Sequence, residues 1–409
     1  MLFRRPGGLS ATLSVRLRRS LSTAAAAAAA ALRPAWAMIH HAILDRSPGL
    51  RASFKLAEPP CPSHIFVPGH LVDPGPRPDP DSDTMSLLGG VVRAVSGDGL
   101  LLLHFSDGRA TAPIVGRHGT SCARRLIDID MDPNTTRFVC NPISGQLFRL
   151  PDIDGTKKTS SCKSLGILTH SERPHGPPDR YAVAELVEDN EGVEGSFLMR
   201  RFLSPTRDWE KLVGLPSPLP VGRRGHKIHD HEVLAFAGRL WWVDVNWGAI
   251  TADPFSDRPE LRFVELPRGS LTEPMEGIRM LGRYRRMGVS EGRLHYAEVS
   301  QEEPFLLSSF VLENDGSWRL QHRVALTRLW EHPSDPCEED KPRIGVIDPL
   351  NSSIMHLTLG NGAFSINMIR RKVLGCGVVG EGTLSSNRAG FKSKTLSDIL
   401  IRVERDKKN

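Results

Sequence analysis

The sequence lacks paired cysteines, and this bears on both metal binding and disulfide chemistry. Its six cysteines lie far apart in the chain: Cys61, Cys122, Cys140, Cys162, Cys337 and Cys376. None forms a Cys-x-x-Cys pair or stands beside a histidine at zinc-ligand spacing, so the common zinc motifs are excluded. We therefore expect buried, reduced thiols in a protein that is not secreted. A disulfide set in a secreted protein is the alternative.

Long apolar runs are also missing. A membrane-spanning helix needs about 20 strongly apolar residues. The alanine run at residues 24–31 is much shorter and only weakly apolar, and no other stretch of the chain is a better candidate. The sequence therefore predicts no membrane span.

Catalytic signatures are the third absence. The chain has no Gly-x-Ser-x-Gly elbow, and no serine or cysteine stands in a recognisable nucleophile context. The glycine pairs Gly97/Gly99 and Gly375/Gly377 lack the lysine and serine of a phosphate-binding loop and therefore indicate turns. We expect no catalytic residue and no cofactor. An enzyme that uses the central channel of its fold stays open as an alternative, because fold does not determine function.

Acidic residues are absent from residues 1–44, which hold six arginines and no lysine. The whole chain has 53 Lys+Arg against 47 Asp+Glu, so the remainder is formally neutral. A neutral body has no overall attraction for phosphate backbones, and we expect no nucleic-acid partner.

The leader at residues 1–35 has the composition of an organellar transit peptide, because it is rich in Arg, Ser and Leu and contains no acid. We expect a disordered targeting presequence and a mitochondrial location. A plastid, or an untargeted protein of the cytoplasm or nucleus, is the alternative.

Short β-type runs separated by turn signals fill most of the chain. Asp-Gly and Asn-Gly pairs supply the positive φ angles that tight hairpins require. Gly192 and Gly238 are 46 residues apart, as are Gly316 and Gly362, and the fragment GRLWWVD at Gly238 resembles GRLHYAE at Gly292. Repeats of about 40–50 residues are typical of propeller blades. The sequence predicts an all-β, β-propeller-like domain of about six blades, each of four short antiparallel strands. A pair of β-sandwiches is the alternative.

Composition also suggests domain boundaries. Residues 36–84 form an N-terminal segment that ends in a Pro/Asp/Gly-rich loop, residues 85–385 hold the propeller-like domain, and residues 386–409 form a basic tail. In the tail, four apolar residues take the i, i+3, i+4 and i+7 positions of a helix: Leu396, Ile399, Leu400 and Val403. This pattern predicts a short C-terminal helix.

Several segments resemble one family. Residues 239–267 read RLWWVDVNWGAITADPFSDRPELRFVELP, and the segments 57–74, 137–151 and 343–375 fit the same family in order. Together they resemble, over about residues 36–376, the domain-of-unknown-function 1618 family of plants, which is expanded in grasses. Segment 137–151, RFVCNPISGQLFRLP, is also similar to the propeller domains of plant F-box proteins, which bind substrates of ubiquitin ligases. Since residues 35–54 lack an F-box pattern, a ligase substrate receptor without its own F-box is only an alternative.

The densest group of aromatic and acidic residues is a candidate recognition surface: Trp241, Trp242, Asp244, Trp247 and Asp253. On a strand, Trp241 and Trp242 point to opposite faces, so one of them is expected in the core. The other could line a binding surface, where tryptophan is energetically favoured. Core packing and recognition both remain open for this group.

The histidines His226, His229 and His231 are the closest approach to a metal motif. Their His-x2-His-x-His spacing matches no common zinc site, and a solvated loop before a strand is the better interpretation. We therefore predict no metal site. Taken together, the sequence predicts a monomeric, non-catalytic protein-interaction or scaffold module in an organelle, with a protein partner that the sequence does not identify.

Overall fold

The structure is a computed structural model that describes most of the chain between residues 36 and 402. The described residues are 36–72, 79, 83–111, 130, 132–155, 164–172, 178–189, 195–220, 232–270, 282–329, 341–360, 362–378 and 399–402. The expected presequence at residues 1–35 lies outside them. Apart from two short 3-10 helices, η1 (Gly69–Leu71) and η3 (Leu326–Arg328), the regular elements of this part are all β-strands. The all-β prediction is confirmed.

The strands of the described residues fall into six groups of four, and we call each group a blade. Blade 1 consists of β1 (Trp36–Asp45), β2 (Ser53–Lys55), β3 (Ser63–Pro68) and β24 (Ile399–Arg402). Blade 2 consists of β4 (Thr84–Val95), β5 (Leu101–Thr111), β6 (Asn134–Cys140) and β7 (Leu147–Arg149). Blade 3 consists of β8 (Gly166–His170), β9 (Arg180–Glu188), β10 (Ser196–Leu203) and β11 (Asp208–Pro216).

The second half of the chain repeats the same plan. Blade 4 consists of β12 (Glu232–Phe236), β13 (Arg239–Asp244), β14 (Gly248–Ala252) and β15 (Arg262–Glu265). Blade 5 consists of β16 (Arg285–Ser290), β17 (Arg293–Val299), β18 (Leu306–Leu312) and β19 (Trp318–Ala325). Blade 6 consists of β20 (Arg343–Ile347), β21 (Ile354–Leu359), β22 (Gly362–Asn367) and β23 (Lys372–Val378).

Blades 3 to 6 are separate sheets, whereas blades 1 and 2 share one eight-stranded sheet in the order β2-β3-β1-β4-β5-β6-β7, with β24 paired to β1. β1 and β4 are joined by two residue pairs, His41 with Val91 and Ala42 with Gly90, so the sheet divides there. Gly90 permits this close approach because a Cβ at that position would collide with the Ala42 carbonyl oxygen. β3 departs from the expected pattern, because it runs parallel to β1.

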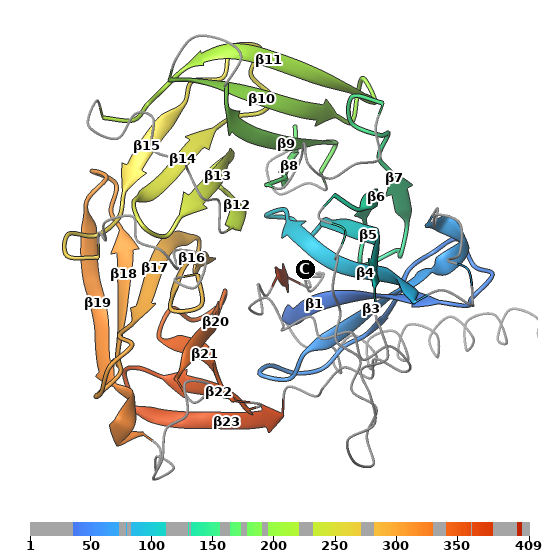
Figure 1. Ribbon diagram of the computed structural model, residues 1–409. Helices are drawn as coiled ribbons and strands as arrows, with labels where there is room; N and C mark the ends of the chain where they lie inside the picture. Colours follow the sequence, from blue (N-terminus) through green and yellow to red (C-terminus); the bar gives the residue numbers. More distant parts are fainter. Residues whose placement is uncertain are drawn as a thin grey trace, which may run out of the picture.

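The six blades surround a common centre (Figure 1). The first strands of the blades lie toward that centre, where β4 contacts β8, β8 contacts β12, and β16 contacts β20. This arrangement confirms the predicted propeller-like fold.

Tight hairpins explain why the repeat was visible in the sequence. Ala237 and Gly238 have φ angles of 49° and 70°, and Glu291 and Gly292 have φ angles of 50° and 74°. Positive φ at both central residues is the geometry that a two-residue hairpin needs. The repeated fragments GRLWWVD and GRLHYAE therefore form β13 and β17, the second strands of blades 4 and 5.

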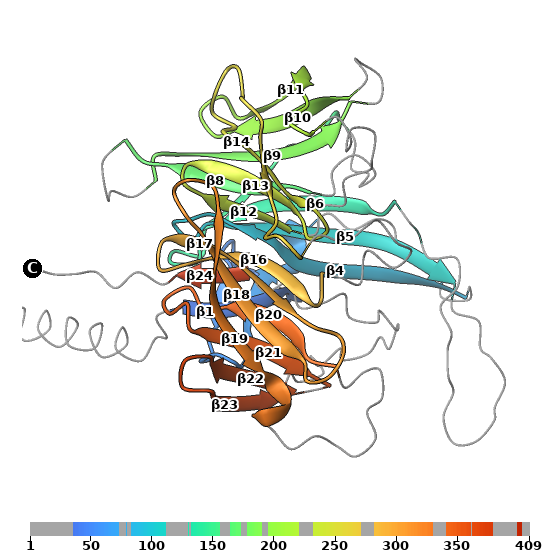
Figure 2. The same cartoon turned by 90° about the vertical axis from the view of Figure 1, so that its left-hand side faces the viewer.

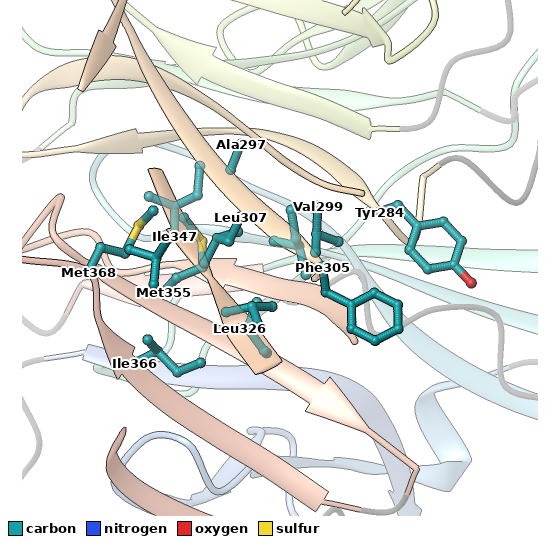
Figure 3. Packing of buried hydrophobic residues seen from close by; sticks show 13 residues of the cluster. Tyr284, Ala297, Val299, Phe305, Leu307, Leu326, Ile347, Met355, Ile366 and Met368 are labelled. Atoms are coloured by element: carbon teal, nitrogen blue, oxygen red, sulfur yellow. The ribbon is translucent and has the colours of Figure 1, made fainter. Parts of the chain in front are cut away.

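Buried apolar clusters fill the seams between neighbouring blades. In the seam between blades 5 and 6, Tyr284 and Phe305 of blade 5 belong to the same cluster as Met355 and Ile366 of blade 6 (Figure 3). Comparable clusters lie between blades 1 and 2, 2 and 3, 3 and 4, and 4 and 5. Burial of these side chains is the main force that holds the blades together.

The C-terminal strand closes the ring and corrects the expected C-terminal helix. Residues 399–402 form β24, which pairs antiparallel with residues 36–39 of β1. A short run of apolar residues fits helix and strand alike when it is considered alone, and the pairing with β1 decides between them. The eight-stranded sheet thus includes strands from residues 36–68 and from residues 399–402.

Candidate functional site

The candidate recognition group from the sequence lies in the interior of blade 4. Trp241 and Trp242 on β13 are 6% and 2% exposed, and Trp247 and Asp244 at the β13–β14 turn are buried as well. Asp253, just after β14, is half-buried. The structure therefore places Trp241, Trp242, Asp244 and Trp247 in the core, which is one of the two alternatives that the sequence left open for this group.

The two neighbouring tryptophans fill the two seams on either side of blade 4. Trp242 packs in the cluster shared with blade 3, and Trp241 packs in the cluster shared with blade 5. Each buried indole has a hydrogen-bond acceptor: Trp242 Nε1 donates to the Ser164 carbonyl at 3.0 Å, and Trp241 Nε1 donates to the Phe236 carbonyl at 3.1 Å. These contacts satisfy the polar end of each side chain and give both a structural role.

Two further tryptophans connect blades at their outer strands. Trp209 on β11 donates to the Pro151 carbonyl at 3.0 Å, and Trp318 on β19 donates to the Glu265 carbonyl at 2.7 Å. Both acceptors lie at or just beyond the fourth strand of the preceding blade. The same bond therefore links blade 3 to blade 2 and blade 5 to blade 4.

A buried chain of Asp348, His356 and Ser365 crosses blade 6. The Nε2 atom of His356 on β21 lies 3.4 Å from Asp348 Oδ2, and the Nδ1 atom lies 2.9 Å from Ser365 Oγ on β22. When Nε2 carries the proton toward the carboxylate, Nδ1 accepts the hydrogen bond of the serine hydroxyl. These residue types are those of a nucleophile–base–acid triad.

Burial gives the hydrogen-bonded group of Asp348, His356 and Ser365 a structural role. Asp348, His356 and Ser365 are 7%, 4% and 6% exposed, so the hydroxyl is not presented to solvent. Asp348 Oδ1 also accepts the backbone N–H groups of Leu350 and Asn351, at 2.8 and 3.0 Å, which closes the β20–β21 turn. This group could not be predicted from the sequence, because its members are eight and nine positions apart on different elements and fit no motif.

Among the side chains that the structure describes, the seam between blades 6 and 1 has the smallest buried apolar cluster. Its apolar cluster consists of Trp36, Met38 and Val346. The Trp36 ring meets the His356 ring edge-on at a centroid distance of 5.1 Å. A small pocket follows the seam, lined by Met38, Pro60, Pro62, Gly345, His356, Leu357, Thr358 and Ala363. This lining combines apolar side chains with the polar side chains of His356 and Thr358.

A charged pair connects the first strands of blades 4, 5 and 6. Arg286 Nε on β16 lies 3.8 Å from Glu232 Oε2 on β12, and the guanidinium donates to the Gly345 carbonyl on β20. Glu232 Oε1 also accepts the Met287 backbone N–H at 2.7 Å. Burial raises the pKa of Glu232, while Arg286 partly offsets this effect. The pair acts as a link between blades, since both groups are engaged with neighbouring strands.

Four exposed large apolar side chains lie on turns of blades 1, 2 and 6. Leu50 in the β1–β2 loop and Ile143 in the β6–β7 turn are 70% and 72% exposed, and Leu350 and Ile369 in two turns of blade 6 are 42% and 66% exposed. We call these four residues the turn surface. Turns between first and second strands and between third and fourth strands lie at one end of an antiparallel blade. Ile143, Leu350 and Ile369 therefore face the same end of the ring.

Backbone hydrogen bonds hold the Leu50–Ile143 part of the turn surface in place. The Ala52 N–H donates to the Gly145 carbonyl at 2.8 Å, which joins the loop after Leu50 to the turn that carries Ile143. Asn141 Oδ1 accepts the Ile143 backbone N–H at 2.9 Å and stabilises the turn. Gly145, with a φ angle of 70°, is required there because a Cβ would collide with the Ala52 carbonyl oxygen.

A similar bond organises the blade 6 part. The Met368 N–H donates to the Ser353 carbonyl at 2.8 Å, so the turn that carries Ile369 is fixed against the turn that carries Leu350. Both pairs of the turn surface are thus held by backbone contacts, and their side chains point outward without cover from the described residues.

Among the described residues, no group of three or more His, Cys, Asp or Glu is placed to bind a metal ion. The sequence motif of His226, His229 and His231 lies outside the described residues. No helix found in the described ranges is long and apolar enough to cross a membrane.

Comparison with family models supports the resemblance seen in the sequence. Residues 242–356 match the family described as "Protein of unknown function (DUF1618)". The family resemblance is confirmed over this stretch. The DUF1618 segment runs from Trp242 on β13 to His356 on β21, and so covers most of blade 4, blade 5 and the start of blade 6. It is narrower than the region over which the sequence motifs suggested the family.

Solved structures resemble the chain only distantly. Prolyl oligopeptidase B from Galerina marginata is 8% identical with a TM-score of 0.28, and the alignment covers 80% of this chain and 42% of that one. A putative 6-phosphogluconolactonase from Bacteroides uniformis is 8% identical with a TM-score of 0.27, covering 74% and 84%. A xylan β-1,4-xylosidase from Bacillus halodurans is 11% identical with a TM-score of 0.29, covering 80% and 63%. A search of curated proteins found no match.

Proposed function

We propose that this protein is a non-catalytic interaction module that binds a protein partner through the turn surface. The observation that supports this most directly is the exposure of Leu50 and Ile143, at 70% and 72%, on a turn fixed by hydrogen bonds. Exposed apolar side chains held in one geometry are typical of protein-binding surfaces, because little conformational entropy is lost on binding.

The charges around the turn surface indicate the kind of partner. Arg51 next to Leu50, and Arg370 and Arg371 next to Ile369, are exposed. A partner that complements this surface has apolar side chains at its centre and carboxylates around them. Binding should therefore combine apolar burial with a moderate dependence on salt.

Crosslinking with mass spectrometry tests the proposal. The full chain, wild type or with Leu50→Asp and Ile143→Asp together, is crosslinked in organelle extract and its captured proteins are compared. The double variant should lose the partner, because two buried carboxylates at the interface carry a desolvation penalty. Val213→Asp on β11 is the matched control, since Val213 is 61% exposed but lies on another blade. Equal capture by all three forms, or no capture by the wild type, would show that the turn surface is not the binding site.

We propose a mitochondrial location for this module, on the basis of its leader. Residues 1–35 contain six arginines and no acid, as matrix-targeting peptides do. A fluorescent reporter fused to these residues should enter mitochondria, and a version with the arginines replaced by glutamine should not. A reporter that stays in the cytoplasm would contradict the proposal.

A further inference from the structure

The face of blade 5 that packs against blade 6 carries polar side chains beside its apolar cluster. Figure 2 looks onto the side of the ring where these two blades meet. Ala297 on β17 and Leu307 on β18 belong to the apolar cluster of this seam (Figure 3). Side chains alternate between the two faces of a strand, so His295 and Ser309, each two positions away, point to the same side. Both therefore lie in the seam.

Both polar side chains are buried without a hydrogen bond to the chain. His295 is 1% exposed and Ser309 is 0% exposed. In the part of the chain that the structure describes, neither ring nitrogen of His295 and no partner of the Ser309 hydroxyl meets hydrogen-bond geometry. The Ser290 backbone lies near the imidazole but does not reach this geometry. A neutral imidazole has one donor and one acceptor, and leaving such groups unsatisfied in the interior is costly.

Small neighbours flank the imidazole. Gly288 on β16 lies directly opposite His295, and Ser309 lies diagonally across from it on β18. Ile347 on β20 covers Gly288, because a Cβ there would lie 3.4 Å from the Ile347 Cδ1 atom. Diagonal neighbours in a sheet are about 7 to 8 Å apart. The imidazole and the hydroxyl are thus near each other without direct contact, which is the arrangement that a bridging water molecule completes.

A third buried polar atom lies on the next strand. β19 has a bulge opposite Ser309 and Phe310, where Gln321 is the additional residue. Gln321 Nε2 donates to Ser352 Oγ in the β20–β21 turn of blade 6 at 3.1 Å. Its Oε1 atom is buried and has no hydrogen-bond partner among the described residues. Polar groups therefore continue from β17 across β18 to β19 and reach blade 6.

We propose that the seam between blades 5 and 6 binds water at a fixed position, where it joins His295 to Ser309. A water molecule donates two hydrogen bonds and accepts two, so it satisfies an imidazole nitrogen and a hydroxyl at once. The Gln321 oxygen can accept a further bond, which extends the link toward blade 6. An apolar ligand would leave all these atoms unsatisfied. A metal ion fits less well, since no group of three His, Cys, Asp or Glu in the described ranges is placed to hold one.

A double-mutant cycle in urea unfolding tests the bridge. Ser309→Ala removes the hydroxyl and should raise the unfolding equilibrium constant about fivefold, because a hydrogen bond to the water is lost. In a His295→Leu background no ring nitrogen holds the water, so the same change should have no effect. If Ser309→Ala is as stable as wild type, or if the loss is equal in both backgrounds, the seam has no bridging water and the proposal fails.

Magnetic relaxation dispersion of the solvent reports long-lived internal water directly. The wild type should give a larger signal from such water than Ser309→Ala. Equal signals would overturn the proposal, and this comparison holds even if His295→Leu does not fold.

Ser308→Ala is the matched control for both measurements. Ser308 is buried on the same strand, but its Oγ accepts a hydrogen bond from Arg323 Nε at 3.1 Å. Its removal should therefore leave the water signal unchanged and should lower stability equally in both backgrounds. Circular dichroism should show that each variant used is folded.

Discussion

At the scale of single residues, His295 makes the stability of the fold depend on pH. Its side chain on β17 is 1% exposed. Burial, with a further contribution from Arg293, lowers the pKa of His295 to about 4. In the unfolded chain the pKa of His295 is near its ordinary value of 6.5. As the pH falls, the unfolded chain therefore binds this proton before the folded chain does. The contribution of His295 to the free energy of unfolding is therefore fully present above pH 6.5 and is lost as the pH falls from 6.5 toward 4.

This linkage can be measured by urea unfolding. Between about pH 7 and about pH 5, wild type should lose about 2 kcal/mol of unfolding free energy more than His295→Gln, which does not titrate. The exposed His70 supplies the control, since His70→Gln should keep the pH dependence of wild type. A His295→Gln protein with the same slope as wild type would mean that another group titrates.

At the scale of elements, single indole bonds connect neighbouring blades. Trp318→Phe removes the N–H that binds the Glu265 carbonyl and keeps an aromatic ring beside Tyr296, whose centroid lies 6.2 Å from that of Trp318. The variant should lose about 1 to 2 kcal/mol of unfolding free energy in a urea titration. Trp209→Phe should lose a similar amount, because Trp209 makes the equivalent bond at the seam between blades 2 and 3. Unchanged stability in both variants would show that these bonds do not contribute.

The elements also show what the sequence can predict. The blades could be predicted from local turn chemistry. Gly238 and Gly292 have the positive φ angles that tight hairpins need, so each marks its hairpin wherever the blade lies in the ring. Contacts between distant segments gave no such signal. Trp242 reaches Ser164 across 78 positions, so its burial depends on which blade lies beside it. β24 becomes a strand only because β1 lies within reach, and the Asp348–His356–Ser365 chain likewise needs the assembled blade.

At the scale of the whole molecule, the six seams differ in strength. Among the side chains that the structure describes, the cluster between blades 5 and 6 has 13 buried apolar residues, whereas the cluster at the closing seam between blades 6 and 1 has three. Cohesion at the closing seam therefore depends more on His356, whose ring contacts Trp36 and is held by Asp348 and Ser365. A closed ring opens first at its weakest seam, because opening elsewhere exposes more apolar surface.

Hydrogen exchange should locate that opening. Backbone amides of β1 and β21 at the closing seam should exchange faster than those of β13 and β17, the equivalent strands of blades 4 and 5. His356→Leu should speed exchange at the closing seam, because it leaves the buried Asp348 and Ser365 without their ring partner. His322→Gln on β19 is the matched control and should leave the closing seam unchanged. Uniform exchange across all blades, or acceleration spread over the whole ring in His356→Leu, would instead indicate that the six blades unfold as one unit.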